Sequence, residues 1–89
     1  MKTRFKFYSD PSHGWVKVDR PLLVSLGIID KITIYSYQRG DFVYLEEDQD
    51  LTTFCNAFFA KYGKDPSLVH MPQSNNRSRI KNYERFGRA

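Results

Sequence analysis

The densest group of acidic side chains in the sequence lies in the five residues from Glu46 to Asp50. Four of them carry carboxylates: Glu46, Glu47, Asp48 and Asp50. Carboxylates at the start of a helix stabilise it by accepting backbone hydrogen bonds and by complementing the helix dipole. An exposed acidic ridge of the same residues would instead imitate nucleic-acid phosphates or dock on a basic protein surface. The spacing lacks the glycine and closing glutamate of a calcium loop, so it does not favour a divalent-metal site.

Aromatic residues recur at every second position in two stretches that are typical of β-strands. Tyr35, Tyr37 and Tyr44 are predicted to share one face of a sheet, which we call the tyrosine face. Arg4 and Lys6 of the N-terminal stretch would lie on the same face. Such rings stack on unpaired bases for about 1–3 kcal/mol each, and they also anchor protein interfaces. Two alternatives remain open: the face is covered within the chain, or it is buried in a homodimer.

The excess positive charge of the chain is confined to its C-terminal segment, residues 73–89. Nine basic and nine acidic residues precede this segment, whereas the segment has five basic residues and one acidic residue. The basic residues are Arg77, Arg79, Lys81, Arg85 and Arg88. They are candidates for binding phosphates. The segment also carries three apolar residues that would cover the tyrosine face if the segment docked there: Ile80, Tyr83 and Phe86.

The sequence has no recognisable catalytic, metal or cofactor motif. The single cysteine, Cys55, falls on the apolar stripe of an expected helix, and His13 and His70 are far apart in sequence. Neither a phosphate-binding glycine loop nor a nucleophile elbow is present. We therefore expect a non-enzymatic protein without cofactor or metal, in a reducing, cytoplasmic setting. No apolar run is long enough to span a membrane, and no signal peptide is expected.

The pattern of apolar residues predicts the elements that position these groups. Strands are expected at 4–8, 31–37, 42–46 and 67–71. A short helix starting near Asp19 and Pro21 and ending at Gly27, and a second helix over 51–62 capped by Asp48 or Asp50, are expected between them. The stretch 15–18 is either a short extended piece or the approach to the first helix.

Two features of this pattern bear on the fold. A hairpin turn centred on Arg39 and Gly40 would pair Tyr37 with Phe42 and Tyr35 with Tyr44, separating apolar from aromatic residues on the two faces. The element order then matches a ferredoxin-like βαββαβ arrangement. We expect an α+β protein with an antiparallel sheet of three to four strands and one or two helices on one face. Residues 1–72 would form the compact domain, to which segment 73–89 belongs.

Several short strings resemble a family of small proteins encoded by bacteriophages and mobile elements. They include Gly14-Trp15, Leu26-Gly27-Ile28, Asp30-Lys31-Ile32, Tyr35-Ser36-Tyr37 with Gly40, Tyr44 to Asp48 with Asp50, and Arg79-Ile80 with Tyr83 and Phe86. Such proteins often disable host defences, among them CRISPR complexes and restriction enzymes. The resemblance implies an inhibitor that binds a host nucleoprotein complex in the host cytoplasm.

Three functions follow as hypotheses. The first is that inhibitor, docking through the acidic ridge with Tyr35, Tyr37 or Tyr44 as anchors. The second is a small protein that binds single-stranded RNA or DNA through the basic residues and the tyrosine face. The third is a structural protein that dimerises through the tyrosine face.

Overall fold

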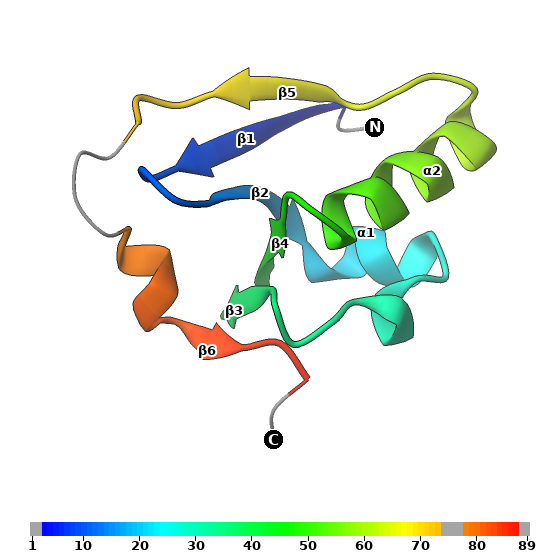
Figure 1. Ribbon diagram of the computed structural model, residues 1–89. Helices are drawn as coiled ribbons and strands as arrows, with labels where there is room; N and C mark the ends of the chain where they lie inside the picture. The colour runs from blue at the N-terminus through cyan, green and yellow to red at the C-terminus, as the bar shows by residue number, and fades with distance from the viewer. Residues whose placement is uncertain (1–2, 74–77, 88–89) are drawn as a thin grey trace.

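The computed structural model describes residues 3–73 and 78–87 and has an α+β fold (Figure 1). Within these residues, six strands form one mixed sheet in the order β5-β1-β2-β4-β3-β6. The strands are β1 (Arg4–Ser9), β2 (Gly14–Asp19), β3 (Tyr37–Arg39), β4 (Phe42–Glu46), β5 (Ser67–His70) and β6 (Glu84–Arg85). The helices are α1 (Arg20–Ser25), α2 (Asp50–Tyr62) and the 3₁₀ helices η1 (Ile29–Lys31) and η2 (Arg79–Asn82).

The expected fold class is confirmed, but the sheet differs from the prediction. It has more strands than expected, and the ferredoxin-like order is not confirmed. The stretch after Gly14 is a full strand near the middle of the sheet, where Val16 and Val18 are completely buried. The last predicted strand, β5, is parallel to β1, with Phe5 opposite Leu68. The sheet is therefore mixed, and β5 forms one of its edges.

The predicted strand at 31–37 is wrong over most of its length. Only Tyr37 belongs to a strand, and Ile34, expected in the core, is 52% exposed. The cause is a competing set of hydrogen bonds. The backbone N–H of Thr33 donates to the Asp50 carboxylate at 3.0 Å, and the Thr33 hydroxyl does so at 2.8 Å. These bonds take the Thr33 amide that a strand would use in its ladder.

The β3–β4 hairpin forms, but its turn lies one residue later than predicted. Gly40 and Asp41 make the turn, with Gly40 at a φ of 59°, and Tyr37 pairs with Tyr44. The predicted partner of Tyr37, Phe42, pairs with Arg39 instead. The register moves by two residues, and a shift of two leaves every side chain on its expected face. The expected separation of aromatic and apolar faces is therefore kept in this hairpin.

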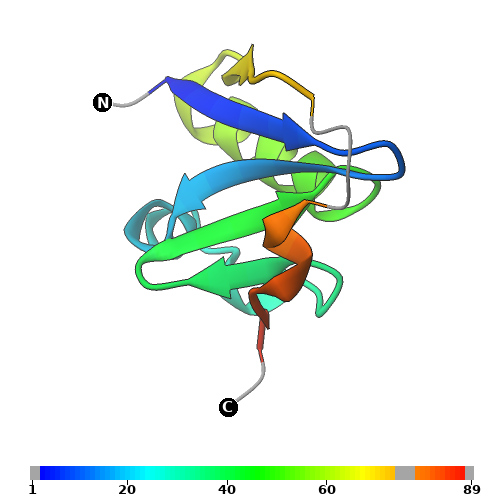
Figure 2. The same cartoon turned by 90° about the vertical axis from the view of Figure 1, so that its left-hand side faces the viewer.

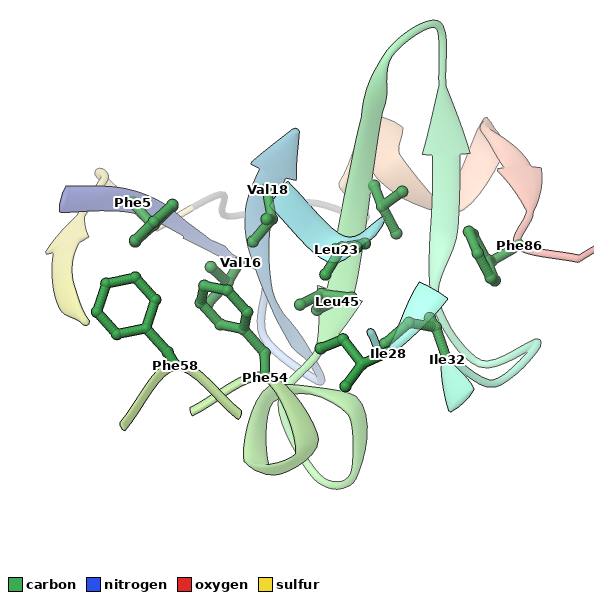
Figure 3. Packing of buried hydrophobic residues seen from close by; sticks show 11 residues of the cluster. Phe5, Val16, Val18, Leu23, Ile28, Ile32, Leu45, Phe54, Phe58 and Phe86 are labelled. Atoms are coloured by element: carbon green, nitrogen blue, oxygen red, sulfur yellow. The ribbon is translucent and has the colours of Figure 1, made fainter. Parts of the chain in front are cut away.

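Both helices pack on one face of the sheet (Figure 1). Phe54 and Phe58 of α2 are fully buried, and the Phe54 ring meets the ring of Phe5 edge to face, with centroids 5.2 Å apart (Figure 3). The expected helix ends are confirmed, since Gly27 and Gly63 follow α1 and α2 with positive φ. This apolar core fixes the sheet and leaves the opposite face for other contacts.

The described part of the C-terminal segment, residues 78–87, covers that opposite face. This is the first of the two alternatives left open by the sequence, in which the tyrosine face is covered within the chain. Figure 2 shows η2 lying in front of β3 and β4. Ile80 packs in a second buried cluster with Trp15, Tyr37 and Tyr44, and Tyr83 lies at its edge. Phe86 instead reaches the helix-side core (Figure 3). The described part of the segment thus belongs to the same fold as residues 3–73.

Candidate functional site

The turn between β1 and β2 is built around one buried carboxylate. Asp10 accepts hydrogen bonds from the backbone N–H of Ser12 at 3.0 Å and of His13 at 2.9 Å. It also accepts one from the N–H of Ser78 at 2.9 Å and pairs with Lys81 at 3.0 Å. Burial opposes ionisation, but these hydrogen bonds outweigh it and hold the pKa of Asp10 well below its ordinary value. Asp10 thereby fastens the C-terminal segment to the sheet.

The acidic cluster at 46–50 has a structural role that the prediction assigned to the wrong residue. The Glu46 carboxylate accepts from the N–H groups of Asp48 at 2.9 Å, Gln49 at 2.5 Å and Asp50 at 2.7 Å. Glu46 therefore caps α2, whereas the cap was expected to be Asp48 or Asp50. Asp50 is completely buried and binds the Ser36 hydroxyl as well as Thr33. The acidic ridge is thus reduced to two exposed members, Glu47 and Asp48.

A pocket of about 490 Å³ opens where these two anchored regions meet. Its lining comes from strands β2, β3, β4 and β6, from η2, and from three connecting segments. These segments are the β1–β2 turn, the loop before β3 and the residues just before α2. The lining residues are His13, Trp15, Tyr35, Tyr37, Glu46, Asp48, Gln49, Lys81 and Arg85. We call it the mixed-charge pocket, because carboxylates and cations share its wall with aromatic rings.

The two cations of the pocket differ in their availability. Lys81 is neutralised by Asp10 and also donates to the Ser12 hydroxyl at 2.8 Å. Arg85 is exposed, stacks over the Tyr37 ring at 4.8 Å and donates to the carbonyl oxygen of Ile34 at 3.1 Å. Among the described residues, no carboxylate forms an ion pair with Arg85. The guanidinium of Arg85 is therefore the pocket's available positive charge.

The pocket brings together residues from two separate sequence hypotheses. Six predicted residues line it: Tyr35, Tyr37, Glu46, Asp48, Lys81 and Arg85. Tyr35 is 61% exposed, as an anchor requires, whereas Tyr37 and Tyr44 are only 8% exposed. Their burial under Ile80 explains why the tyrosine face is not an open stacking surface.

The remaining predicted residues lie elsewhere. Arg4 and Lys6 are exposed on β1 and line neither this pocket nor the two hollows at Arg79. Glu47 is exposed next to Glu46 and Asp48 in sequence but does not line the pocket. Arg79 lines a different groove, described below. Arg77 and Arg88 lie outside the described residues.

Sequence reasoning missed three residues of the pocket: His13, Trp15 and Gln49. The His13 ring lies 5.9 Å from the Trp15 ring, which is itself almost completely buried. His13 lies in the turn that Asp10 organises, and Trp15 follows that turn on β2. A turn sequence such as Asp10-Pro11-Ser12 signals the local bend, but the approach of η2 to that turn comes from contacts across the whole chain.

The described residues were compared with the arrangements that metal binding, a reactive thiol and a membrane span require. It contains no group of three or more His, Cys, Asp or Glu side chains placed to hold a metal. Burial, with a smaller effect from the Asp65 carboxylate, raises the pKa of the Cys55 thiol, which disfavours the reactive thiolate. Within the same residues, no helix combines the length and apolar character that crossing a membrane requires.

Comparison of the chain with models of protein families, with curated proteins and with solved structures gives no match.

Proposed function

We propose that this chain is a non-enzymatic docking protein whose mixed-charge pocket receives a segment of a partner protein. The observation that carries the proposal is that exposed Tyr35, Asp48 and Arg85 line a single pocket on a firmly held framework. Tyr and Arg are the residues that most often dominate binding energy at protein interfaces. Asp48 and Arg85 suit a partner surface that carries both signs of charge.

The mixed charge supports a protein partner for this pocket in preference to a nucleic acid. Glu46 and Asp48 line the pocket, and Glu47 is exposed next to them in sequence. A polyanion that reached Arg85 would approach these carboxylates, and like charges at close range oppose binding. A peptide segment can place a cation near Asp48 and a carboxylate near Arg85 at once.

The partner we propose is a host defence complex of the CRISPR or restriction type, in the cytoplasm of a bacterial host. The resemblance to phage and mobile-element proteins supports this choice, and the pocket supports the docking mode. The chain would act as an inhibitor by occupying a surface that the complex needs for its action on nucleic acid.

A host strain with active CRISPR or restriction interference tests the proposal through plasmid transformation. Expression of the chain should restore transformation of a targeted plasmid, and Tyr35→Ala or Asp48→Lys should each remove most of this protection. Lys64→Ala, an exposed change outside the pocket, should protect as well as the wild type. If the wild-type chain protects neither against CRISPR interference nor against restriction, the inhibitor function is rejected.

Retention on the immobilised defence complex separates docking from inhibition. A hot-spot loss of about 2 kcal/mol corresponds to roughly 30-fold weaker binding for Tyr35→Ala. Equal retention of Tyr35→Ala and wild type would remove the pocket from the docking mode, even if the chain inhibits.

Dimerisation through the tyrosine face is the less supported alternative. Ile80 and Tyr83 of the same chain already pack against Tyr37 and Tyr44. A second copy would have to displace η2, which Asp10 holds through Ser78 and Lys81. We expect a monomer in analytical sedimentation, because η2 of the same chain already covers the tyrosine face.

A further inference from the structure

A second concave surface lies on the other side of the C-terminal segment, between that segment and the β3–β4 hairpin. It has a volume of about 660 Å³ and shares no residue with the mixed-charge pocket. Three arginines line it: Arg20 at the start of α1, Arg39 on β3 and Arg79 on η2. The other lining residues are Gln38, Gly40, Asn82, Tyr83 and Glu84. We call it the arginine groove.

Hydrogen bonds and ring contacts hold the groove in shape. Arg20 donates to the side-chain oxygen of Gln38 at 2.8 Å, and the Gln38 amide donates to Glu84 at 2.6 Å. This chain of bonds connects α1, β3 and β6 across the groove. On the other side, the Arg39 guanidinium lies 5.1 Å from the Tyr83 ring. Contacts within the fold therefore position the side chains of Arg20 and Arg39.

The charges of the groove are largely available to a ligand. Glu84 is the one carboxylate among its lining residues, and it already accepts the Gln38 amide. Within residues 3–73 and 78–87, no hydrogen bond or ion pair engages the guanidinium of Arg39 or Arg79. A guanidinium has five donors in a planar fork that matches phosphate oxygens. Three guanidinium groups and one carboxylate give the lining of the groove an excess of positive charge.

The positive surface continues past the groove along the covered face of the sheet. A smaller hollow of about 420 Å³ shares Arg79 and Tyr83 with the groove and adds Lys17, with Tyr8 and Tyr44. Lys17 lies over the Phe42 ring at 4.1 Å. Cations from α1, β3, η2 and β2 thus follow one another, with aromatic rings among them. This arrangement is longer than a single phosphate requires.

We propose that the arginine groove and the adjoining Lys17 hollow bind the phosphodiester backbone of single-stranded nucleic acid. Successive phosphates would meet Arg20, Arg39 and Arg79, and unstacked bases would lie against the guanidinium planes and the exposed part of Tyr83. A duplex fits less well, because the helices that line the groove, α1 with six residues and η2 with four, are too short to enter a major groove as a recognition helix does.

The inference does not rest on the docking proposal, since the two sites share no residue. It also changes the set of candidate basic residues. Of the residues predicted from sequence for nucleic acid, Arg79 alone among those described lines the groove, while Lys81 and Arg85 line the mixed-charge pocket. Sequence reasoning placed Arg39 in the hairpin turn, and neither Arg20 nor Lys17 was a predicted site residue.

The test is fluorescence anisotropy of a labelled single-stranded oligonucleotide, about 20 nucleotides long, in DNA and RNA forms. Four phosphate contacts, through Arg20, Arg39, Arg79 and Lys17, predict that log affinity falls with log salt concentration with a slope of about −3. The double variant Arg39→Ala with Arg79→Ala should bind about tenfold or more weakly and reduce the steepness of the slope by about 1.4. Tyr35→Ala, which alters the mixed-charge pocket, should bind oligonucleotide like the wild type.

The matched control is Arg4→Ala with Lys6→Ala, which removes the same charge from exposed positions outside the groove. It should change the affinity only a few-fold. Equal losses in the two double variants would mean that net charge alone drives binding and would overturn the groove. Absence of binding at about 50 mM salt, or tighter binding of a duplex of the same sequence, would also overturn the proposal. Competition by free inorganic phosphate at millimolar concentration would reassign the groove to a small anion.

Discussion

At the scale of single residues, two carboxylates that look like surface charges in the sequence are structural. Asp10 joins the β1–β2 turn to Ser78 and Lys81, 68 or more positions away in the chain. Glu46 closes the start of α2. Asp10 and Glu46 stabilise the fold, whereas the exposed carboxylates of Glu47 and Asp48 are available to a partner. Substitutions at the two kinds of position should therefore differ in outcome.

Asp10→Asn should lower the free energy of unfolding by about 1–3 kcal/mol, because the buried Lys81 contact and the backbone donors lose their ionised acceptor. The pKa of Asp10 is depressed in the folded state, so the unfolded state binds more protons at acid pH. Wild-type stability from this source is complete above about pH 4 and is lost as the pH falls further. Urea denaturation between pH 7 and pH 2 measures both effects.

The variant should lose that part of the pH dependence, since asparagine does not titrate. An unchanged pH profile in Asp10→Asn would show that Asp10 is not the ionised acceptor of this turn.

Glu46→Ala should destabilise the protein by about 1 kcal/mol, because three N–H groups at the start of α2 lose their acceptor. Glu47→Ala is the control. Its side chain is exposed and the expected change is below about 0.5 kcal/mol. Thermal unfolding followed by circular dichroism compares the two. Equal destabilisation by Glu46→Ala and Glu47→Ala would contradict the assignment of the α2 cap to Glu46.

At the scale of elements, the position of η2 determines which side chains on this face of the sheet are buried and which line a pocket. It places Ile80 on Trp15, Tyr37 and Tyr44, and it separates the mixed-charge pocket from the arginine groove. Figure 2 shows this short helix crossing the strands that carry the tyrosines. Both candidate binding surfaces depend on it.

Ile80→Ala should cost about 2–5 kcal/mol, the range for truncating a buried isoleucine. Trp15 is the single tryptophan of the chain and is almost fully buried in the same cluster as Ile80, so its fluorescence reports on the packing of this cluster. We expect a red-shifted emission in the variant at denaturant concentrations where the wild type is still folded. Arg79→Ala, one position away and exposed, should leave emission and stability unchanged within about 0.5 kcal/mol.

The elements that sequence reasoning predicted correctly are those with a strong local signal. The alternation of β1, the apolar stripe of α2 and the glycines after α1 and α2 depend on neighbouring residues. The stretch at 31–37 has the same alternation, yet Asp50 draws Thr33 out of the ladder. A long-range hydrogen bond of this kind leaves no periodic signal in the sequence. The same holds for the two-residue shift in the hairpin register.

The candidate sites were predictable only in part, for a related reason. Sequence reasoning named six residues of the mixed-charge pocket but assigned them to two different hypotheses. It did not relate Lys81 and Arg85 to Glu46 and Asp48, because the docking of η2 and β6 on the sheet brings them together. The arginine groove depends on the same docking. Its arginines lie at positions 20, 39 and 79, with no spacing that marks them as a set.

At the scale of the whole molecule, the basic C-terminal segment is integrated in the fold. Ile80 fills the cluster on one side of the sheet, Phe86 fills the core on the other, and β6 pairs with β3 through Gln38 and Glu84. Anchoring on both faces implies that this segment and the sheet unfold together. It also means that Arg79 lies at a fixed place in the groove, and Lys81 and Arg85 at fixed places in the pocket.

A single cooperative transition is therefore expected for the full chain. Unfolding in urea followed by Trp15 fluorescence, which senses η2, and by far-ultraviolet circular dichroism, which senses the whole backbone, should give coincident curves. A chain ending at residue 77 loses both Ile80 and Phe86, and we expect it to be largely unfolded or to bind the dye ANS through the uncovered aromatic residues. A Trp15 transition that precedes the loss of circular dichroism would show that η2 detaches on its own. The tyrosine face would then be accessible in a partly open state, and dimerisation or base stacking through it would regain support.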